Sequence, residues 1–227
     1  MILAAGRGER MRPLTDRVPK ALLEAGGRPL IVRLIERLAR AGFADLVVNV
    51  SHLGGMIEEQ LGDGTRFGVR IAYSRERTAL ATGGGIAYAL PLLGTAPFAV
   101  VNSDVYSDFD FARLRPAAAA LAGGKLSAHL VLVDNPPHHP AGDFCLREGM
   151  VTVEETQRLT FSGIGVYAPI LFAQVARGSK WPLVALLNPA LAQRRVSGEH
   201  HRGLWIDIGT PQRLADLECA LVSNGNR

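Results

Sequence analysis

The chain opens on Met1-Ile2-Leu3-Ala4-Ala5-Gly6-Arg7-Gly8-Glu9-Arg10-Met11, and Pro19-Lys20 closes the same segment. The apolar run predicts a short strand that leads directly into a glycine-rich turn. Glycine adopts the backbone angles, and leaves the clearance, that let backbone N–H groups approach a phosphate chain. Arg10 and Lys20 bracket the turn, so an anion held there would also meet a planar guanidinium and a compact ammonium. The segment therefore predicts a phosphate-binding loop at the end of a strand.

This loop differs from two familiar phosphate-binding motifs. A dinucleotide fingerprint has a third glycine where this chain has Met11, and a P-loop has Gly-Lys followed by Ser or Thr, which the stretch lacks. Taken alone, Gly-x-Gly after a strand is equally compatible with an ordinary strand-to-helix turn and solvated basic residues. The rest of the chain has to decide between these interpretations.

Composition indicates a globular protein of 227 residues, 48% of them hydrophobic. A chain of this size can bury a hydrophobic core without disulfides or metal ions to stabilise it. The net charge of +4 is modest and no Lys/Arg run resembles a nucleic-acid arm, so we expect the basic excess to serve a small polyanion. Cys145 and Cys219 lie far apart, which suggests no disulfide framework and fits a reducing cytoplasm. No segment reaches the roughly eighteen apolar residues of a membrane span. The first strand begins so early that we expect a residue or two before Met1.

Strand-like apolar runs alternate with helical patterns in the first half of the chain. Apolar residues recur at helical spacing over 29–41, with Pro29 at the start and Gly42 just past the end. The elements expected next are strands over 45–50, 69–73 and 98–101 and helices over 54–61 and 84–90. Such alternation predicts an α/β fold with a Rossmann-like, mixed and mainly parallel sheet flanked by helices. Ligands bind at the carboxyl ends of such strands, where Gly6 and Asp104 both lie.

The alternation loosens in the second half. The elements expected there are helices over 112–122, 169–176, 183–187 and 211–222, strands over 128–133, 161–167 and 204–208, a turn-rich insertion over 135–140 and a hairpin over 144–153. We interpret the insertion and hairpin as an acceptor-binding lobe. The chain is predicted to form a single domain over 1–227, with this lobe inserted into it.

Two aspartates are candidate metal ligands. Asp104 follows a buried apolar run, and Asp207 occupies a comparable place after Trp205-Ile206. An acid in such a position costs desolvation unless it is paired or bound to a metal. Mg²⁺ favours one or two carboxylates together with phosphate oxygens and waters. An isolated aspartate is more simply a helix cap or a salt-bridge partner, but the phosphate-binding loop reverses that preference.

The histidines indicate no metal site. His138-His139 and His200-His201 are adjacent pairs, and neighbouring side chains of an extended segment point to opposite faces, which is poor zinc geometry. We expect all 6 histidines to be structural or to contact substrate. The sequence contains no Ser-His-Asp set and no nucleophile elbow, so covalent catalysis is not indicated.

Several stretches, in order along nearly the whole chain, together resemble the sugar-1-phosphate nucleotidylyltransferases. These are Leu3-Ala4-Ala5-Gly6-Arg7-Gly8-Glu9-Arg10-Met11-Arg12-Pro13-Leu14-Thr15, Pro19-Lys20, Gly27-Arg28-Pro29-Leu30, Thr82-Gly83-Gly84-Gly85-Ile86, Asn102-Ser103-Asp104 and Trp205-Ile206-Asp207-Ile208-Gly209-Thr210-Pro211. Within that family, the stretches 133–144 and 161–164 resemble the N-acetylmuramate α-1-phosphate uridylyltransferases. The resemblance implies a nucleotidyltransferase domain of the GT-A-like fold with a small sugar-binding lobe. It divides the chain into a nucleotide-binding half of roughly 1–110 and a half over 111–227 that binds the sugar and carries the second metal ligand.

The resemblance also implies roles for individual residues. The loop from Gly6 to Arg10 would wrap the triphosphate, with Arg10 and Lys20 as catalytic residues at the departing pyrophosphate and the reacting phosphates. Asp104 and Asp207 would hold Mg²⁺. The nucleotide-binding residues that it implies are Leu3, Ala4, Ala5, Gly6, Gly8, Glu9, Arg10, Lys20, Gly83, Gly84 and Asn102. The residues that it implies for the amino sugar are Asp143 and, more weakly, Glu155 and Ser162.

The chain departs from the family pattern at two positions. Ala81 stands before Thr-Gly-Gly-Gly-Ile where related sequences usually have Glu, and Ser103 stands where Gly is common. The phosphate loop and the metal acids remain. We therefore expect the chemistry to be kept, with at most an altered position of the glycine turn or the nucleoside.

The implied activity is transfer of UMP from UTP to a sugar 1-phosphate, with N-acetylmuramate α-1-phosphate favoured, giving UDP-N-acetylmuramate and pyrophosphate in peptidoglycan recycling. Arg202 could meet the lactyl carboxylate of that sugar, although a solvated loop arginine is the simpler interpretation. The alternatives are a guanylyl- or thymidylyltransferase acting on mannose or glucose 1-phosphate and, from another class, a non-catalytic nucleotide-sugar-binding regulatory module. We expect a cytoplasmic protein with no nucleic-acid or membrane partner, and a monomer is compatible with the sequence.

Overall fold

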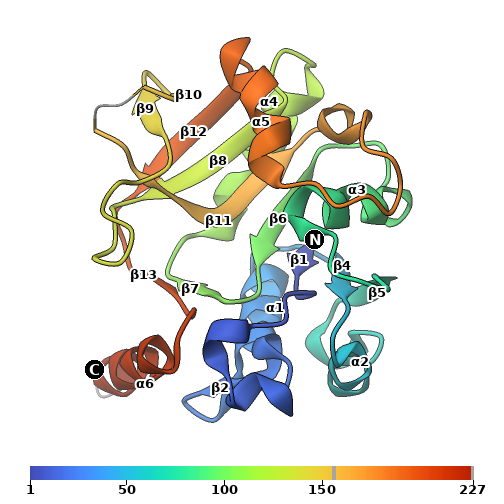
Figure 1. The fold of residues 1–227 in the computed structure, drawn as a ribbon, viewed down its shortest axis with the longest axis vertical. Coiled ribbons are helices and arrows are strands. Elements are labelled where there is room, and N and C mark those ends of the chain that lie inside the picture. The colour runs from blue at the N-terminus through green and yellow to red at the C-terminus, as the bar shows by residue number, and fades with distance from the viewer. Residues whose placement is uncertain (155–156, 226–227) are drawn as a thin grey trace. The chain divides into compact units, whose positions relative to one another are not determined.

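The computed structural model describes residues 1–154 and 157–225 (Figure 1). The chain divides into two compact units. The first unit comprises Ile2–Ala79, Asn102–Phe111 and Leu204–Arg227, and the second comprises Met1, Leu80–Val101 and Ala112–Gly203. Within the described ranges, no helix combines the length and the apolar character required to cross a bilayer.

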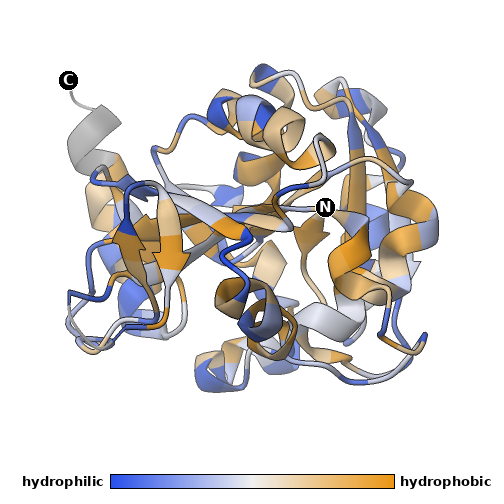
Figure 2. Cartoon of the chain, turned by 90° about the horizontal axis from the view of Figure 1, so that it is seen from above, coloured by the Kyte–Doolittle hydropathy of each residue, from blue (hydrophilic) through white to orange (hydrophobic). Residues whose placement is uncertain are grey.

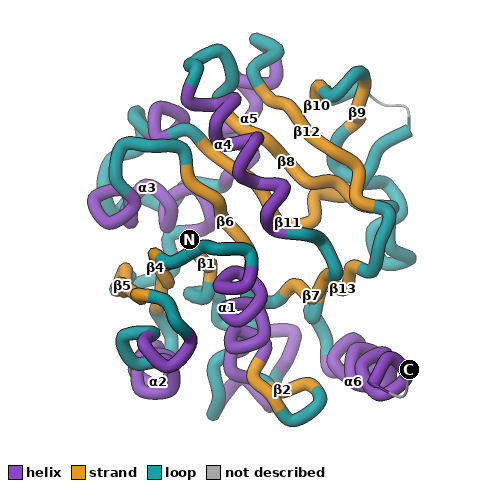
Figure 3. Tube along the Cα trace, turned by 180° about the vertical axis from the view of Figure 1, so that it is seen from behind, coloured by secondary structure: helices purple, strands orange, loops and turns teal. Residues whose placement is uncertain are grey.

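The first unit is built on a parallel ladder in which β4 (Asp45–Val50) pairs with both β1 (Ile2–Leu3) and β5 (Arg70–Arg75). Helix α1 (Leu30–Arg40) precedes β4 and helix α2 (Gly54–Leu61) follows it, as Figures 1 and 3 show. The apolar stripe predicted for 29–41 is buried on α1. Because parallel strands need crossover helices, the βαβ order read from the sequence accounts for this ladder.

The C-terminal segment completes the first unit. Strand β13 (Trp205–Asp207) pairs antiparallel with β7 (Val105–Ser107), and α6 (Pro211–Gly225) packs beside the short hairpin of β2 (Glu24–Ala25) and β3 (Arg28–Pro29). A shared core is formed by Met11, Leu23, Ala25, Leu30, Ile208 and Leu217. Residues from both ends of the chain therefore bury one another.

The second unit contains a mixed sheet in which β8 pairs parallel with β12 but antiparallel with β11. Its strand order is β6 (Phe98–Asn102), β11 (Thr160–Tyr167), β8 (Ala128–Val133), β12 (Val196–His201), β10 (Met150–Thr152) and β9 (Cys145–Arg147). Its helices are α3 (Ala81–Leu93), α4 (Leu114–Ala122) and α5 (Leu183–Ala192). Figure 2 shows hydrophobic stretches on both strands and helices, and Leu130, Val131 and Leu132 of β8 are fully buried.

The predicted α/β class, with a mixed sheet and flanking helices, is confirmed. The predicted halves, 1–110 and 111–227, do not coincide with the two units. Residues 204–225 return to the first unit, because β13 pairs with β7 and α6 shares its core, whereas 80–101 belong to the second. The expectation that the whole chain acts as one nucleotidyltransferase domain stays a prediction.

Strand β12 was not predicted, because Ser197-Gly198-Glu199-His200 carries no apolar alternation. It is held by its neighbours: a Cβ at Gly198 would lie 2.7 Å from Val151 Cγ2 and 2.8 Å from the Leu130 carbonyl oxygen. Only glycine lets the neighbouring strands β8 and β10 approach this closely. Tertiary packing, rather than local propensity, therefore forms this strand.

Candidate active site

The phosphate-binding loop leaves β1 through the buried residues Ala4 and Ala5 and then turns at Gly6 and Gly8. Gly8 has φ +67°, and a Cβ there would lie 3.0 Å from Thr15 Cγ2 and 3.1 Å from Lys20 Cβ. Gly6 lies in open space, with nothing within 4 Å of the position of a Cβ. Gly8 is thus required by the packing of the loop, whereas Gly6 keeps one side of the loop clear for a ligand.

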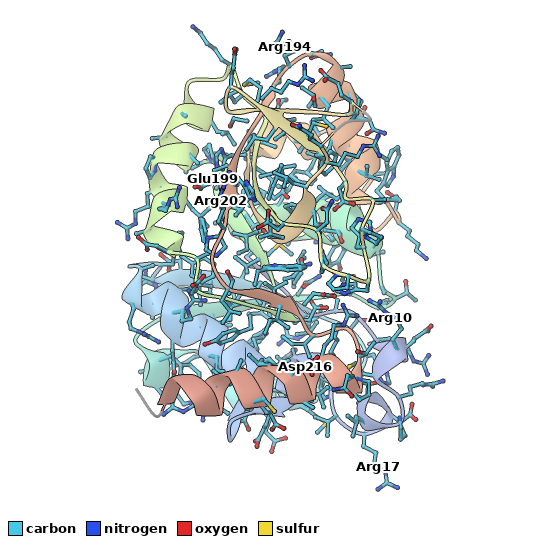
Figure 4. The ribbon with its side chains drawn as sticks, turned by 90° about the vertical axis from the view of Figure 1, so that its left-hand side faces the viewer. Arg10, Arg17, Arg194, Glu199, Arg202 and Asp216 are labelled. Carbon is cyan, nitrogen blue, oxygen red and sulfur yellow. The ribbon has the colours of Figure 1, made fainter. Side chains whose placement is uncertain are left out.

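A single 3-10 turn, Glu9–Met11, follows Gly8 and sets the direction of Arg10. The Met11 side chain is fully buried in the core of the first unit, while Glu9 and Arg10 are exposed. The Thr15 hydroxyl donates a hydrogen bond of 2.8 Å to the Gly8 carbonyl. Met11 and Thr15 therefore hold the loop against the core of the first unit. Arg10 projects beside the segment that leads into α6 (Figure 4).

Lys20 and Asp104 form an ion pair at the carboxyl end of the ladder. The Ser103 N–H donates to the Leu3 carbonyl at 3.0 Å, which places the residue after it beside the end of β1. The Lys20 side chain is 12% exposed and the Asp104 side chain 32% exposed. The structure thus brings together a lysine and an aspartate that are distant in sequence.

Asp207 lies on the strand next to the segment of Asp104. It stands opposite Val105 in the β7–β13 ladder, and the Ile208 N–H donates to the Asp104 carbonyl at 2.7 Å. The two predicted metal acids therefore come from neighbouring backbone segments of the same unit.

Arg213 contacts Asp207, an interaction that the sequence did not predict. Its Nη1 donates to both carboxylate oxygens of Asp207 at 2.5 Å, and its side chain is only 14% exposed. A Cβ at Gly209 would lie 2.3 Å from Arg213 Nη2 and 3.1 Å from Arg10 Nη2. Gly209 consequently leaves room for two guanidinium groups at one turn. No spacing rule links an aspartate to an arginine six residues later at a strand-to-helix junction, so the sequence offered no signal.

A cavity of about 340 Å³ within the first unit is lined by the loop together with Lys20 and Asp104. Its lining residues are Gly6, Gly8, Glu9, Arg10, Lys20, Asp104 and Gly209. All but Gly209 belong to the set predicted from the sequence. Loop backbone, the cations of Arg10 and Lys20 and the carboxylates of Glu9 and Asp104 face one cavity, an arrangement that fits a polyphosphate bound together with a cation.

The two aspartates match the oxygen ligands that Mg²⁺ takes when a substrate supplies phosphate oxygens and water completes the shell. Both carboxylates are partly exposed, at 32% for Asp104 and 23% for Asp207, and each is paired with a cation, Asp104 with Lys20 and Asp207 with Arg213. Among the described residues, no group of three or more His, Cys, Asp or Glu side chains could hold a metal ion alone. The donor set therefore fits an ion that is bound jointly with a phosphate ligand.

In the second unit, the predicted glycine turn is part of a helix. Gly83 and Gly84 are buried in the first turns of α3, where the Gly84 N–H donates to the Trp181 carbonyl at 3.0 Å. A Cβ at Gly84 would lie 2.3 Å from the Ser179 carbonyl oxygen. The glycines admit the 179–181 backbone against α3, which explains why the helix begins before the predicted residue 84. Their contact with a nucleoside stays a prediction, as does that of Asn102 at the end of β6.

The predicted sugar-binding residues differ in how far their side chains are exposed to solvent. The Asp143 carboxylate accepts hydrogen bonds from the Phe161 N–H at 2.8 Å and from His139 Nε2 at 3.0 Å, and its side chain is 37% exposed. Ser162 is 1% exposed, and its hydroxyl donates to the Val131 carbonyl at 2.7 Å. This geometry disfavours a substrate contact for Ser162. Glu155 lies outside the described residues.

The family model described as nucleotidyl transferase matches residues 1–160, more than half of the chain. The chain belongs to this family. An N-acetylmuramate alpha-1-phosphate uridylyltransferase of Neisseria meningitidis serogroup B is 51% identical and covers 96% of both chains. Another, of Caulobacter vibrioides, is 36% identical and covers 98% of this chain and 96% of its own. The solved structure of HddC from Yersinia pseudotuberculosis, complexed with GMP-PN, has a TM-score of 0.79 at 19% identity and covers 97% of each chain, which supports the fold.

Proposed function

We propose that this protein transfers UMP from UTP to N-acetylmuramate α-1-phosphate, releasing pyrophosphate and forming UDP-N-acetylmuramate. The observation that carries the proposal is the cavity in which the loop backbone, Arg10, Lys20 and Asp104 converge. The choice of base and sugar rests on the relative of Neisseria meningitidis that is 51% identical along nearly the full chain.

In the proposed reaction, a phosphate oxygen of the sugar 1-phosphate attacks the α-phosphorus of UTP. The new bond joins that oxygen to the α-phosphorus, and the bond from the α-phosphorus to the bridging oxygen of the β-phosphate breaks. Pyrophosphate leaves with the electron pair. Since the attacking oxygen is already ionised, the site needs to position the phosphates and to stabilise charge, and it needs no general base.

The residues of the cavity suit these tasks. Backbone N–H groups of the Gly6–Arg10 loop would hold the triphosphate, Arg10 would face the departing pyrophosphate, and the Lys20 ammonium would offset charge on the reacting phosphates. Asp104 and Asp207 would hold Mg²⁺, which when bound supplies positive charge to the phosphate oxygens. Arg213 and Lys20 neutralise these carboxylates before any ion arrives.

The remaining assignments are extensions of the same proposal. Gly83, Gly84 and Asn102 would border the nucleoside, and Asp143 would face the amino sugar with Glu155 as a further candidate. The exposed Arg202 follows β12 near Glu199 (Figure 4) and is a candidate for the lactyl carboxylate. In the cell the enzyme would serve peptidoglycan recycling in the cytoplasm.

A pyrophosphate-release assay tests the function directly. It would use UTP, GTP and dTTP, each with the 1-phosphates of N-acetylmuramate, N-acetylglucosamine, glucose and mannose. We expect the highest kcat/KM for UTP with N-acetylmuramate α-1-phosphate. Preference for GTP or dTTP with mannose or glucose 1-phosphate would refute the specificity, and nucleotide-sugar binding with no turnover of any pair would indicate a regulatory module.

A further inference from the structure

A buried polar pair lies beneath the phosphate-binding loop and outside the residues that line the cavity. Asn49, on β4, is 4% exposed, and Glu76, just after β5, is 6% exposed. Burying an amide and a carboxyl group is unfavourable unless both are hydrogen-bonded. Their place in the core of the first unit therefore needs a structural reason.

The pair is tied to the first residue after β1. The Ala4 N–H donates to Asn49 Oδ1 at 2.8 Å, and Asn49 Nδ2 donates to Glu76 Oε1 at 2.6 Å. In the β1–β4 ladder Leu3 stands opposite Asn49, so the side chain continues the hydrogen bonding at the point where the backbone ladder ends. The Glu76 N–H donates to the Val50 carbonyl at 2.9 Å, which fixes the acceptor in turn.

The chemistry of the three groups allows one arrangement of the amide. The Ala4 N–H can only donate, so it requires the oxygen of Asn49, and an ionised carboxylate can only accept, so it requires the nitrogen. Glu76 therefore orients the Asn49 amide, and the amide orients the Ala4 peptide. Ala4 lies two residues before Gly6, the first residue that lines the cavity.

We propose that Asn49 and Glu76 are positioning residues that set the direction in which the phosphate-binding loop leaves β1. This inference rests on the proposed function and adds residues that touch neither substrate nor metal. Displacement of reacting groups by about 1 Å can cost on the order of 10²-fold in rate, so an anchor two residues upstream of the loop can affect turnover.

The test reverses which residue of the pair donates the hydrogen bond and which accepts it. Asn49→Asp keeps an acceptor for the Ala4 N–H but sets a second carboxyl group against Glu76, and like charges at this distance repel. The double variant Asn49→Asp with Glu76→Gln restores a donor–acceptor match, because the new amide donates to the new carboxylate. We expect the single variant to lose about 10²-fold in kcat/KM for UTP and the double variant to recover to within about threefold of wild type.

Val48→Ala serves as the matched control. Val48 is fully buried on the same strand and takes no part in the network, so the substitution should lower Tm and leave kcat and KM for UTP unchanged. If Asn49→Asp loses stability but shows wild-type kcat and KM, or if the folded double variant fails to recover, the positioning role is overturned.

Glu76→Ala alone provides a second measurement should Asn49→Asp not fold. It removes the oxygen that accepts from Asn49 Nδ2, so the amide is no longer held from that side and fixes the Ala4 peptide less firmly. We expect kcat/KM for UTP to fall about 3- to 10-fold and the Ala4 amide hydrogen to exchange faster in NMR spectra. Unchanged kinetics and exchange would overturn the inference, whereas an inactive wild-type protein would overturn the proposed function instead.

Discussion

Gly8→Ala would place a methyl group where the phosphate-binding loop has no room for one. The residue has φ +67°, a conformation that costs an L-residue other than glycine roughly 1–2 kcal/mol. The new Cβ would also lie 3.0 Å from Thr15 Cγ2 and 3.1 Å from Lys20 Cβ, which is closer than most carbon contacts. Both effects destabilise the folded state, and the second pushes on the stem of a residue that lines the cavity.

We expect the free energy of unfolding to fall by about 2 kcal/mol, which for a chain of this size corresponds to a Tm lower by roughly 4–8 °C. We also expect kcat/KM for UTP to fall on the order of 10²-fold, because a displaced Lys20 no longer meets the phosphates correctly. Calorimetry measures the first quantity and pyrophosphate release the second.

Gly6→Ala is the matched control, because a Cβ there meets nothing within 4 Å. This variant should keep the Tm of wild type and raise only KM for UTP, since the methyl group would occupy the open side of the loop. Equal Tm values for the two variants would refute the reasoning, as would a Gly8→Ala protein with wild-type kinetics.

Three further predictions concern other features of the molecule. Lys20→Ala should lower turnover by about 10²–10³-fold while the far-ultraviolet circular dichroism stays that of wild type, and turnover near wild type would contradict the proposed role. Chelation of divalent ions by EDTA should abolish pyrophosphate release and added Mg²⁺ should restore it; persistent activity in EDTA would exclude the assignment of Asp104 and Asp207. Thr152→Val should raise the free energy of unfolding by about 1 kcal/mol, because the buried Thr152 hydroxyl has no hydrogen-bond partner among the residues that the structure describes; a lower Tm in thermal denaturation would contradict this.

The sequence was informative wherever local pattern and tertiary packing agree. The strands over 45–50 and 128–133 and the helix over 54–61 have the predicted bounds, because continuous apolar runs and helical spacing coincide with their burial. The cavity was largely predictable as well. Its residues cluster in one glycine-rich segment and at the end of one strand, so a parallel sheet brings them to the same edge.

The features that the sequence did not reveal depend on contacts between distant segments. Arg213 looks like a solvated helix residue until β13 and α6 place it on Asp207. The glycines 83–85 suggest a turn, but the backbone of 179–181 packs against them and they continue as a helix. In the sequence Asn49 is one polar residue in an apolar strand, and its role becomes visible only from its hydrogen bonds to the Ala4 N–H and to Glu76.

The pairing of β13 with β7 has a consequence for how the protein is made. Asp104 is synthesised before the midpoint of the chain, but the strand that carries Asp207 and the helix that buries Leu217 against Met11 and Leu30 follow residue 204. On the ribosome, the first unit must therefore keep an open core and only one of its two aspartates until residues 204–225 emerge. A nascent chain stalled near residue 203 would expose that core, and the cavity would form only after the segment that carries Gly209 has been synthesised.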